Sequence, residues 1–115
     1  MMELDKDTIN ILGTEYRIMT QTEEENRKLR NANAICEVYD KTIILNGSIQ
    51  QDEDSYDNFD AFRRKVLRHE LIHAFFAESG LRNNSDFAEN EELVDWIAIQ
   101  FPKIAKVFSE LNILE

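Results

Sequence analysis

The spacing of apolar and polar residues changes near Asp57, from short strand-like runs before it to helical periods after it. Before this point, runs rich in β-branched and aromatic residues predict strands at 9–20, 34–40 and 42–45. A strand requires only that its residues suit a pleated, half-buried surface, which these residue types do. The first half of the chain is therefore predicted to form a small sheet.

The connections between these runs carry turn signals. Asp40-Lys41 separates two of the predicted strands, and Asn46-Gly47 follows the last because both residue types tolerate the positive φ of tight turns. The polar segment 22–30 predicts an exposed helix that starts with a capping box of Thr22 and Glu25. The acidic stretch 51–58 predicts a surface loop.

After Asp57 the apolar residues recur at steps of three and four, which is the period of one helix face. The members of this face are Phe59, Phe62, Val66, His69, His73 and Phe76. Gly80 is a plausible helix stop. A second helix is predicted from Asp86, with Asp86 and Glu89 as a capping box, to Phe101. Pro102 suits the first turn of a third helix over 104–111.

These elements predict an α+β domain, with a small antiparallel sheet followed by two helices and a C-terminal helix. The chain of 115 residues is long enough for one hydrophobic core and too short for two. No internal repeat or linker rich in proline and glycine interrupts the sequence. We therefore expect residues 1–115 to form a single domain.

The charge and the cysteine content exclude several classes of protein. A net charge of −10 argues against nucleic-acid binding, which needs a basic face to neutralise phosphates. No apolar run approaches the roughly 20 residues of a membrane span, so no membrane partner is expected. Cys36 is the single cysteine, and the N-terminus lacks the layout of a signal peptide, which together predict a cytoplasmic protein.

A local basic cluster departs from this acidic balance. Arg63, Arg64, Lys65 and Arg68 place four positive charges just before the first motif histidine. A solvated helix face is the default interpretation of such a cluster. A groove that receives an acidic partner is the alternative.

The motif His69-Glu70-Leu71-Ile72-His73 carries the candidate chemistry. Residues four apart on a helix point in nearly the same direction, so His69 and His73 can bind one metal ion. Glu70 can then reach a water at that ion without being a ligand, and can act as its general base. These two histidines are the only ones in the chain. The competing interpretation is a pair of core histidines bonded to the backbone.

A catalytic zinc site needs a third protein ligand, and with no third histidine the candidates are Cys36 or a carboxylate. The helix after Asn90 offers Glu91 and Glu92. Asp95 lies one turn after Glu91, where it could accept the free ring N–H of a ligand histidine. The residue one turn after Glu92 is Trp96, which has no acceptor. This favours Glu91 as the ligand, with Glu92 as the alternative.

At these residues the chain resembles the gluzincin metallopeptidases, in which His-Glu-x-x-His is followed by a glutamate on a later helix. The block Asn90-Glu91-x-x-x-Asp95 is similar to a segment of the thermolysin-like enzymes. This resemblance implies a zinc ion held by His69, His73 and Glu91, with Asp95 behind the ligands. In size and order of elements the chain also resembles the small ImmA/IrrE-type metallopeptidases of phage and mobile elements, which cleave repressor-like proteins. Residues 93–98 depart from that pattern, and its register would shift the third ligand to Glu92.

Two functions remain open on the sequence alone. The first is a zinc peptidase that acts on a protein or peptide substrate, with Glu70 as general base. The second is a non-catalytic binding or regulatory module that zinc stabilises. A peptidase also needs a donor that stabilises the oxyanion, for which Tyr16, Tyr39, Tyr56 and Arg82 are candidates. Neither the substrate nor the oligomeric state is encoded in a recognisable pattern.

Overall fold

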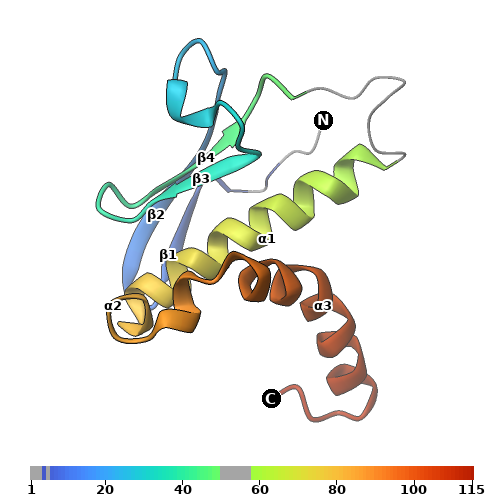
Figure 1. The fold of residues 1–115 in the computed structure, drawn as a ribbon. Coiled ribbons are helices and arrows are strands. Elements are labelled where there is room, and N and C mark those ends of the chain that lie inside the picture. The colour runs from blue at the N-terminus through green and yellow to red at the C-terminus, as the bar shows by residue number, and fades with distance from the viewer. Residues whose placement is uncertain (1–3, 5, 50–57) are drawn as a thin grey trace.

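A computed structural model describes residue 4, residues 6–49 and residues 58–115 of the chain. The α+β class is confirmed (Figure 1). Four strands come first, namely β1 (Thr8–Ile11), β2 (Thr14–Gln21), β3 (Ala34–Glu37) and β4 (Thr42–Asn46). The helices follow, namely α1 (Phe59–Glu78), α2 (Leu81–Asn84) and α3 (Glu91–Glu110). The 3-10 turns η1 (Arg27–Leu29) and η2 (Asp86–Glu89) complete the described elements.

The sheet has the strand order β1-β2-β4-β3 and is mixed, so the expectation of a purely antiparallel sheet is wrong for its central pair. The outer pairs β1–β2 and β3–β4 are antiparallel, whereas β2 and β4 are parallel, with Arg17 opposite Thr42. The physical reason is the route of segment 22–33. This segment leads from the end of β2 to the start of β3, so that β3 runs opposite to β2. The β3–β4 hairpin then reverses the chain again, and β4 therefore runs parallel to β2.

The single strand predicted over 9–20 is a hairpin, because the chain turns at Leu12 and Gly13 between β1 and β2. Both residues have positive φ, 51° and 98°, and Asn10 Oδ1 accepts a hydrogen bond from the Gly13 amide at 2.8 Å. Glycine adopts this conformation without steric cost. The predicted β3–β4 hairpin is confirmed, with Lys41 at φ 53° in its turn, although β3 ends at Glu37 rather than Asp40.

The helix predicted over 22–30 is wrong. Thr22 and Glu25 do make the reciprocal contacts of a capping box, with the Thr22 amide bonded to Glu25 Oε1 at 2.9 Å and the Glu25 amide to Thr22 Oγ1 at 3.2 Å. These bonds close an isolated turn, and only η1 follows. With Leu29 as its one large buried residue, the segment has no apolar stripe to stabilise a longer helix.

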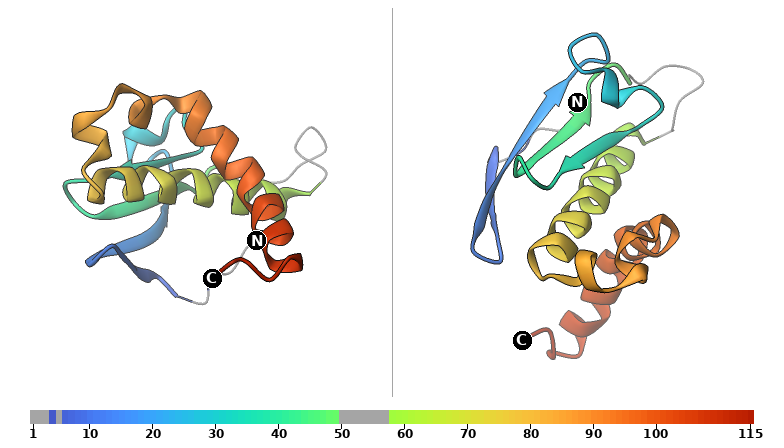
Figure 2. Two further views of the ribbon diagram at one scale, coloured as in Figure 1. Left: turned by 90° about the horizontal axis from the view of Figure 1, so that it is seen from below. Right: turned by 60° about the vertical axis from the view of Figure 1, so that its left-hand side comes forward.

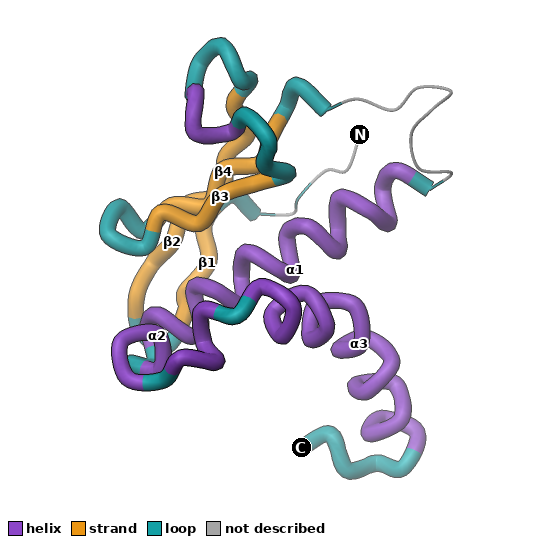
Figure 3. The backbone as a smooth tube through the Cα atoms, viewed as in Figure 1, coloured by secondary structure: helices purple, strands orange, loops and turns teal. Residues whose placement is uncertain are grey.

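Helix α1 lies between the sheet and α3, as the views of Figures 2 and 3 show. Asn58 caps its start by accepting a hydrogen bond from the Ala61 amide at 3.0 Å, and the chain leaves the helix through Gly80 at φ 86°. The residues that α1 and the strands bury together include Ile11, Tyr16, Ile43, Leu45, Phe59, Phe62, Val66, Leu67 and Ala74. The loop predicted over 51–58 lies outside the described residues except for Asn58.

Helix α3 differs in two respects from the two helices predicted over 86–101 and 104–111. It begins at Glu91 rather than Asp86, because Asn90 caps it by accepting a hydrogen bond from the Leu93 amide at 2.9 Å. It also continues through Pro102 to Glu110 instead of stopping for a third helix. Figure 1 shows α3 changing direction part-way along, as expected where proline removes a backbone hydrogen bond. No helix of the described chain is both long and apolar enough to span a membrane.

Candidate metal centre

The two motif histidines project from adjacent turns of α1 toward α3. Their ring centroids are 4.9 Å apart, and the two Nε2 atoms are separated by 3.2 Å. Ligands held at about 2.0–2.1 Å by a tetrahedral zinc ion stand roughly 3.3 Å from one another. The spacing of the two ring nitrogens is therefore close to that of two ligands of one ion.

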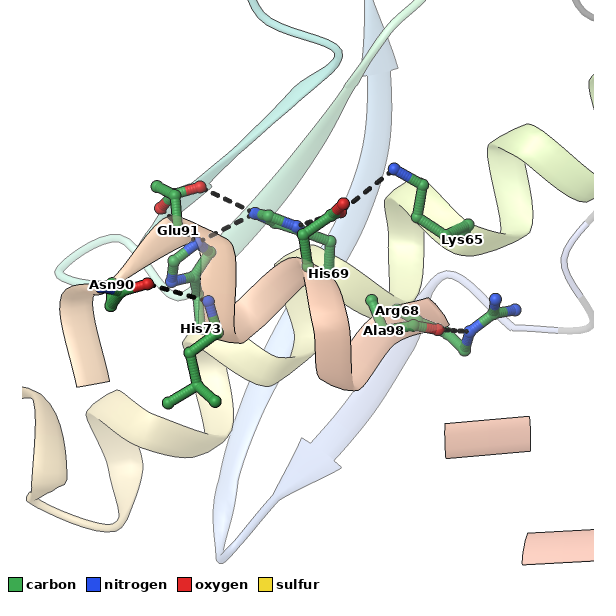
Figure 4. A network of polar contacts seen from close by, with 9 residues as sticks. Lys65, Arg68, His69, His73, Asn90, Glu91 and Ala98 are labelled. Carbon is green, nitrogen blue, oxygen red and sulfur yellow. Dashed lines mark hydrogen bonds and ion pairs between the residues drawn. The ribbon is translucent and has the colours of Figure 1, made fainter. Parts of the chain in front are cut away.

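Glu91 reaches both histidines from the first turn of α3 (Figure 4). Its Oε2 lies 2.9 Å from His69 Nε2, and its Oε1 lies 2.8 Å from His73 Nε2. The cap at Asn90 makes Glu91 the first helical residue and directs its side chain toward α1. Glu92, the alternative ligand, is an exposed residue of the same turn. The structure thus brings Glu91, the favoured candidate, to the two imidazoles.

Asp95 lies behind His69, one turn after Glu91. Its Oδ1 is 3.1 Å from His69 Nδ1 and 3.1 Å from Lys65 Nζ. Burial by itself raises the pKa of Asp95, but the hydrogen bonds from Lys65 and His69 outweigh it and leave the pKa below its ordinary value. An ionised carboxylate only accepts hydrogen bonds, so His69 Nδ1 carries the ring proton. With the ring proton on Nδ1, the second nitrogen, Nε2, faces Glu91 and can offer its lone pair to a metal ion.

This arrangement of lone pairs fits a cation. In neutral His69, the lone pair of Nε2 and the carboxylate of Glu91 are both acceptors, and they face each other at 2.9 Å. Burial lowers the pKa of His73 and so favours its neutral ring as well. A positive charge between the rings and the carboxylate would satisfy all three groups. The donor set of two imidazoles and one carboxylate is the type that binds zinc in catalytic sites.

Glu70 lies beside this cluster but is directed inward. Its side chain is 6% exposed, and its Oε2 has no hydrogen-bond partner among the residues that the structure describes. Burial raises the pKa of Glu70 to about 7; the Glu91 carboxylate adds to this rise and His69 opposes it. One ligand-type atom from each of His69, Glu70 and His73 lies within 4.8 Å of the others, so this group could hold a metal ion.

Two open pockets meet at the cluster. Both are lined by Ala34, Glu70 and Glu91; the first extends past Lys65 and the second past Arg82. Strand β3 borders the second pocket through Ala34, Ile35 and Cys36, and its first residue, Ala34, also lines the first pocket together with the preceding residues 31–33. Cys36, considered above as a ligand, is thus a wall residue of the second pocket. Burial raises the pKa of its thiol to about 12, which disfavours the thiolate that binds metals.

The candidates for an oxyanion donor that the structure describes differ in their burial and in their position relative to the site. Tyr16 is fully buried, and its hydroxyl donates to Glu78 Oε2 at 2.7 Å. Tyr39 is 90% exposed, and Tyr56 lies outside the described residues. Arg82 lines the second pocket together with His73 and Glu91, and its Nε is 3.6 Å from Glu89. Arg82 is therefore the candidate that the fold brings to the site.

The four basic residues before the motif do not share one solvated face. Arg63 is 4% exposed and donates from Nη1 to the Asn46 carbonyl at 2.9 Å. Lys65 pairs with Asp95, and Arg68 donates from Nε to the Ala98 carbonyl at 2.7 Å. Arg64 alone of the four is exposed. Sequence reasoning missed that Lys65 belongs to the site; its position one turn before His69 was the available signal.

Comparisons with models of protein families, with curated proteins and with solved structures found no match for this chain.

Proposed function

We propose that the chain is a zinc-dependent peptidase of the cytoplasm, with His69, His73 and Glu91 as metal ligands and Glu70 as general base. The observation that carries this proposal is the convergence of two imidazoles and the Glu91 carboxylate beside a buried carboxylate with an unpartnered oxygen. A site that only held a metal ion would have no use for Glu70 in that position, because an unpartnered buried oxygen is costly to maintain.

Zinc held by these residues would supply Lewis acidity, which polarises a carbonyl group and lowers the pKa of water. Glu70 Oε2 would accept the proton of the attacking water and pass it to the leaving amine. Asp95 would hold His69 in the tautomer that offers Nε2, and Lys65 would keep Asp95 ionised. Arg82, which lines the second pocket together with His73 and Glu91, would stabilise negative charge that develops on the substrate.

A peptide is the substrate class that suits the surroundings of the site. β3 is an outer strand of the sheet, and within the described chain its far edge pairs with no other strand. It borders both pockets, so an extended peptide that paired with β3 would pass across Glu70 and Glu91. Backbone pairing of this kind supports peptide-bond hydrolysis over the hydrolysis of a small molecule.

One observation favours a second function, a zinc-stabilised binding module without turnover. The histidines come from α1 and the carboxylate from α3, so a metal ion would fasten the two helices together. In that case the metal would contribute to folding, and the pockets would serve recognition only.

A Glu70→Gln variant separates the two functions. Zinc content per chain and cleavage of a mixture of unstructured peptides, followed by mass spectrometry, would be measured for the parent and the variant. The peptidase proposal expects both proteins to bind zinc and only the parent to cleave. Zinc binding without cleavage by either protein would favour the binding module. A parent that binds no zinc would overturn both.

A further inference from the structure

An apolar groove lies between α1 and the middle of α3, apart from the metal centre. Its walls are Leu71, Ile72, Phe75, Phe76, Ile97 and Phe101. Among the residues that the structure describes, Arg68 is the one charged residue that lines it, and its Nε already donates to the Ala98 carbonyl. The groove encloses about 460 Å³ and shares no residue with the two pockets at the metal centre. This volume is that of a ligand-sized pocket, which is enough for several side chains.

An apolar ridge continues from this groove along the distal half of α3. Phe101, Ile104, Phe108 and Leu111 recur at steps of three and four, which aligns them on one face. Three of them are strongly exposed, at 55% for Phe101, 42% for Phe108 and 64% for Leu111. The bend of α3 carries this half of the helix away from α1 and the sheet (Figures 1 and 2). The ridge therefore has no covering element among the described parts of the chain.

We propose that the chain forms a two-fold symmetric dimer in which the ridge of each copy fills the groove of the other. The groove is concave and the ridge convex, and Phe101 belongs to both. A two-fold axis beside Phe101 would therefore bring each ridge into the opposite groove with one self-complementary contact, as closed dimers require. The second copy is thus the partner that matches both surfaces at once.

The exposed area is sufficient for such a dimer. Large apolar side chains present on the order of 200 Å² each, so the exposed fractions of Phe75, Phe101, Phe108, Leu111 and Ile113, whose amide bonds to the Phe108 carbonyl, leave about 500 Å² per chain. This area lies toward the upper end of the apolar patches that single monomers expose. Two copies would bury about 1,000 Å², near the minimum for a specific interface, before any polar rim is counted.

The charge of the chain opposes a membrane as the occupant. Anionic lipid surfaces attract amphipathic helices through a basic polar face. Here the net charge is −10, Lys103 and Lys106 are the only basic residues of the distal half of α3, and part of the apolar surface is a concave groove between two helices. The same net charge makes two copies repel each other at long range, so added salt is expected to strengthen the dimer.

The test is sedimentation velocity of the parent and of three variants over the micromolar range. Phe108→Glu and Leu111→Glu place a charge on the ridge, and Ile99→Glu is the matched control. Ile99 is as exposed as Phe108, at 42%, but lies about two and a half turns away on the opposite face of α3. Circular dichroism checks that each variant keeps its helices.

The proposal expects twice the chain mass for the parent and for Ile99→Glu, and a monomer for both ridge variants. Two ridge variants are used because one of them could fail to fold for local reasons. A monomeric parent at all concentrations would overturn the dimer, whether or not the chain binds vesicles or another protein. A dimer that persists in both ridge variants would place the interface elsewhere and would also overturn it.

Discussion

Asp95 Oδ1 lies 3.1 Å from His69 Nδ1, and this contact joins α3 to α1 across 26 residues of sequence. The same carboxylate oxygen is 3.1 Å from Lys65 Nζ. Asp95 thereby fixes which nitrogen of His69 carries the proton and which is offered to a metal ion. The contact lies behind the proposed ligands, so its effect on metal binding can be separated from that of the ligands themselves.

Asp95→Asn is expected to weaken zinc binding by about 10- to 100-fold while the protein stays folded, because an amide holds the His69 tautomer less strongly. Zinc affinity would be measured by competition with a chromophoric chelator. Asp86→Asn, a change of the same kind at an exposed position of η2, is the control and should leave the affinity unchanged. Equal affinities for the parent and Asp95→Asn would contradict this role.

Glu91→Gln is expected to lose more zinc affinity than Asp95→Asn, because it removes the charge of the carboxylate whose two oxygens each face one Nε2 atom. The neighbouring Glu92→Gln removes the same charge from the same helical turn and is expected to keep the affinity of the parent. Zinc per chain after dialysis, measured by elemental analysis, distinguishes the two. If Glu92→Gln loses its zinc and Glu91→Gln keeps it, the ligand assignment is reversed.

The parts of the site that follow helical spacing were predictable from the sequence. His69 and His73 are four residues apart, as are Glu91 and Asp95, and this spacing alone defines two helix faces. The contact between those faces depends on how α3 packs on α1, which local spacing does not determine. The opposed lone pairs of His69 and Glu91 are a product of that packing, so no pattern in the sequence reveals them.

The errors in the fold have a similar origin. Residues 9–20 are rich in β-branched and aromatic residues on both sides of Leu12 and Gly13, so this composition concealed the turn that separates β1 from β2. The parallel pairing of β2 with β4 depends on the tertiary structure, and the sequence of neither strand indicates it. Pro102 did indicate an interruption of the helix. The helix accommodates the proline as a bend, because helical residues continue on both sides of it.

Arg63→Met is expected to lower the free energy of unfolding by about 1–3 kcal/mol, because it leaves the buried Asn46 carbonyl without its donor. Methionine preserves most of the apolar volume, which isolates the lost hydrogen bond. Arg64→Met, at the adjacent exposed position, is expected to change stability by less than about 0.5 kcal/mol. Urea unfolding in the presence of a chelator would measure both. Equal losses would mean that Arg63 contributes charge rather than a specific bond.

Glu78, which ends α1 against the sheet, makes the stability of the protein depend on pH. Its Oε2 accepts hydrogen bonds from Lys41 Nζ at 2.8 Å and from the Tyr16 hydroxyl at 2.7 Å. These bonds, with Lys41 the strongest influence and a hydrogen bond from Thr14 adding to them, lower the pKa of Glu78 from 4.5 to about 2. A carboxyl group with a lowered pKa in the folded state stabilises that state above its unfolded pKa, and this stabilisation is lost as the pH falls.

The parent is therefore expected to be more stable than Glu78→Gln at neutral pH, and this difference should shrink as the pH falls from about 4.5 toward 2. Urea unfolding across that range, with chelator present, would measure the free energy of unfolding of both proteins. Glu15→Gln, an exposed residue of β2 beside Tyr16, is the control and should follow the parent at every pH. If the free energies of unfolding of the parent and of Glu78→Gln differ by the same amount at every pH, the pKa of Glu78 is not lowered by folding. The hydrogen bonds at its carboxylate would then contribute no linkage to pH.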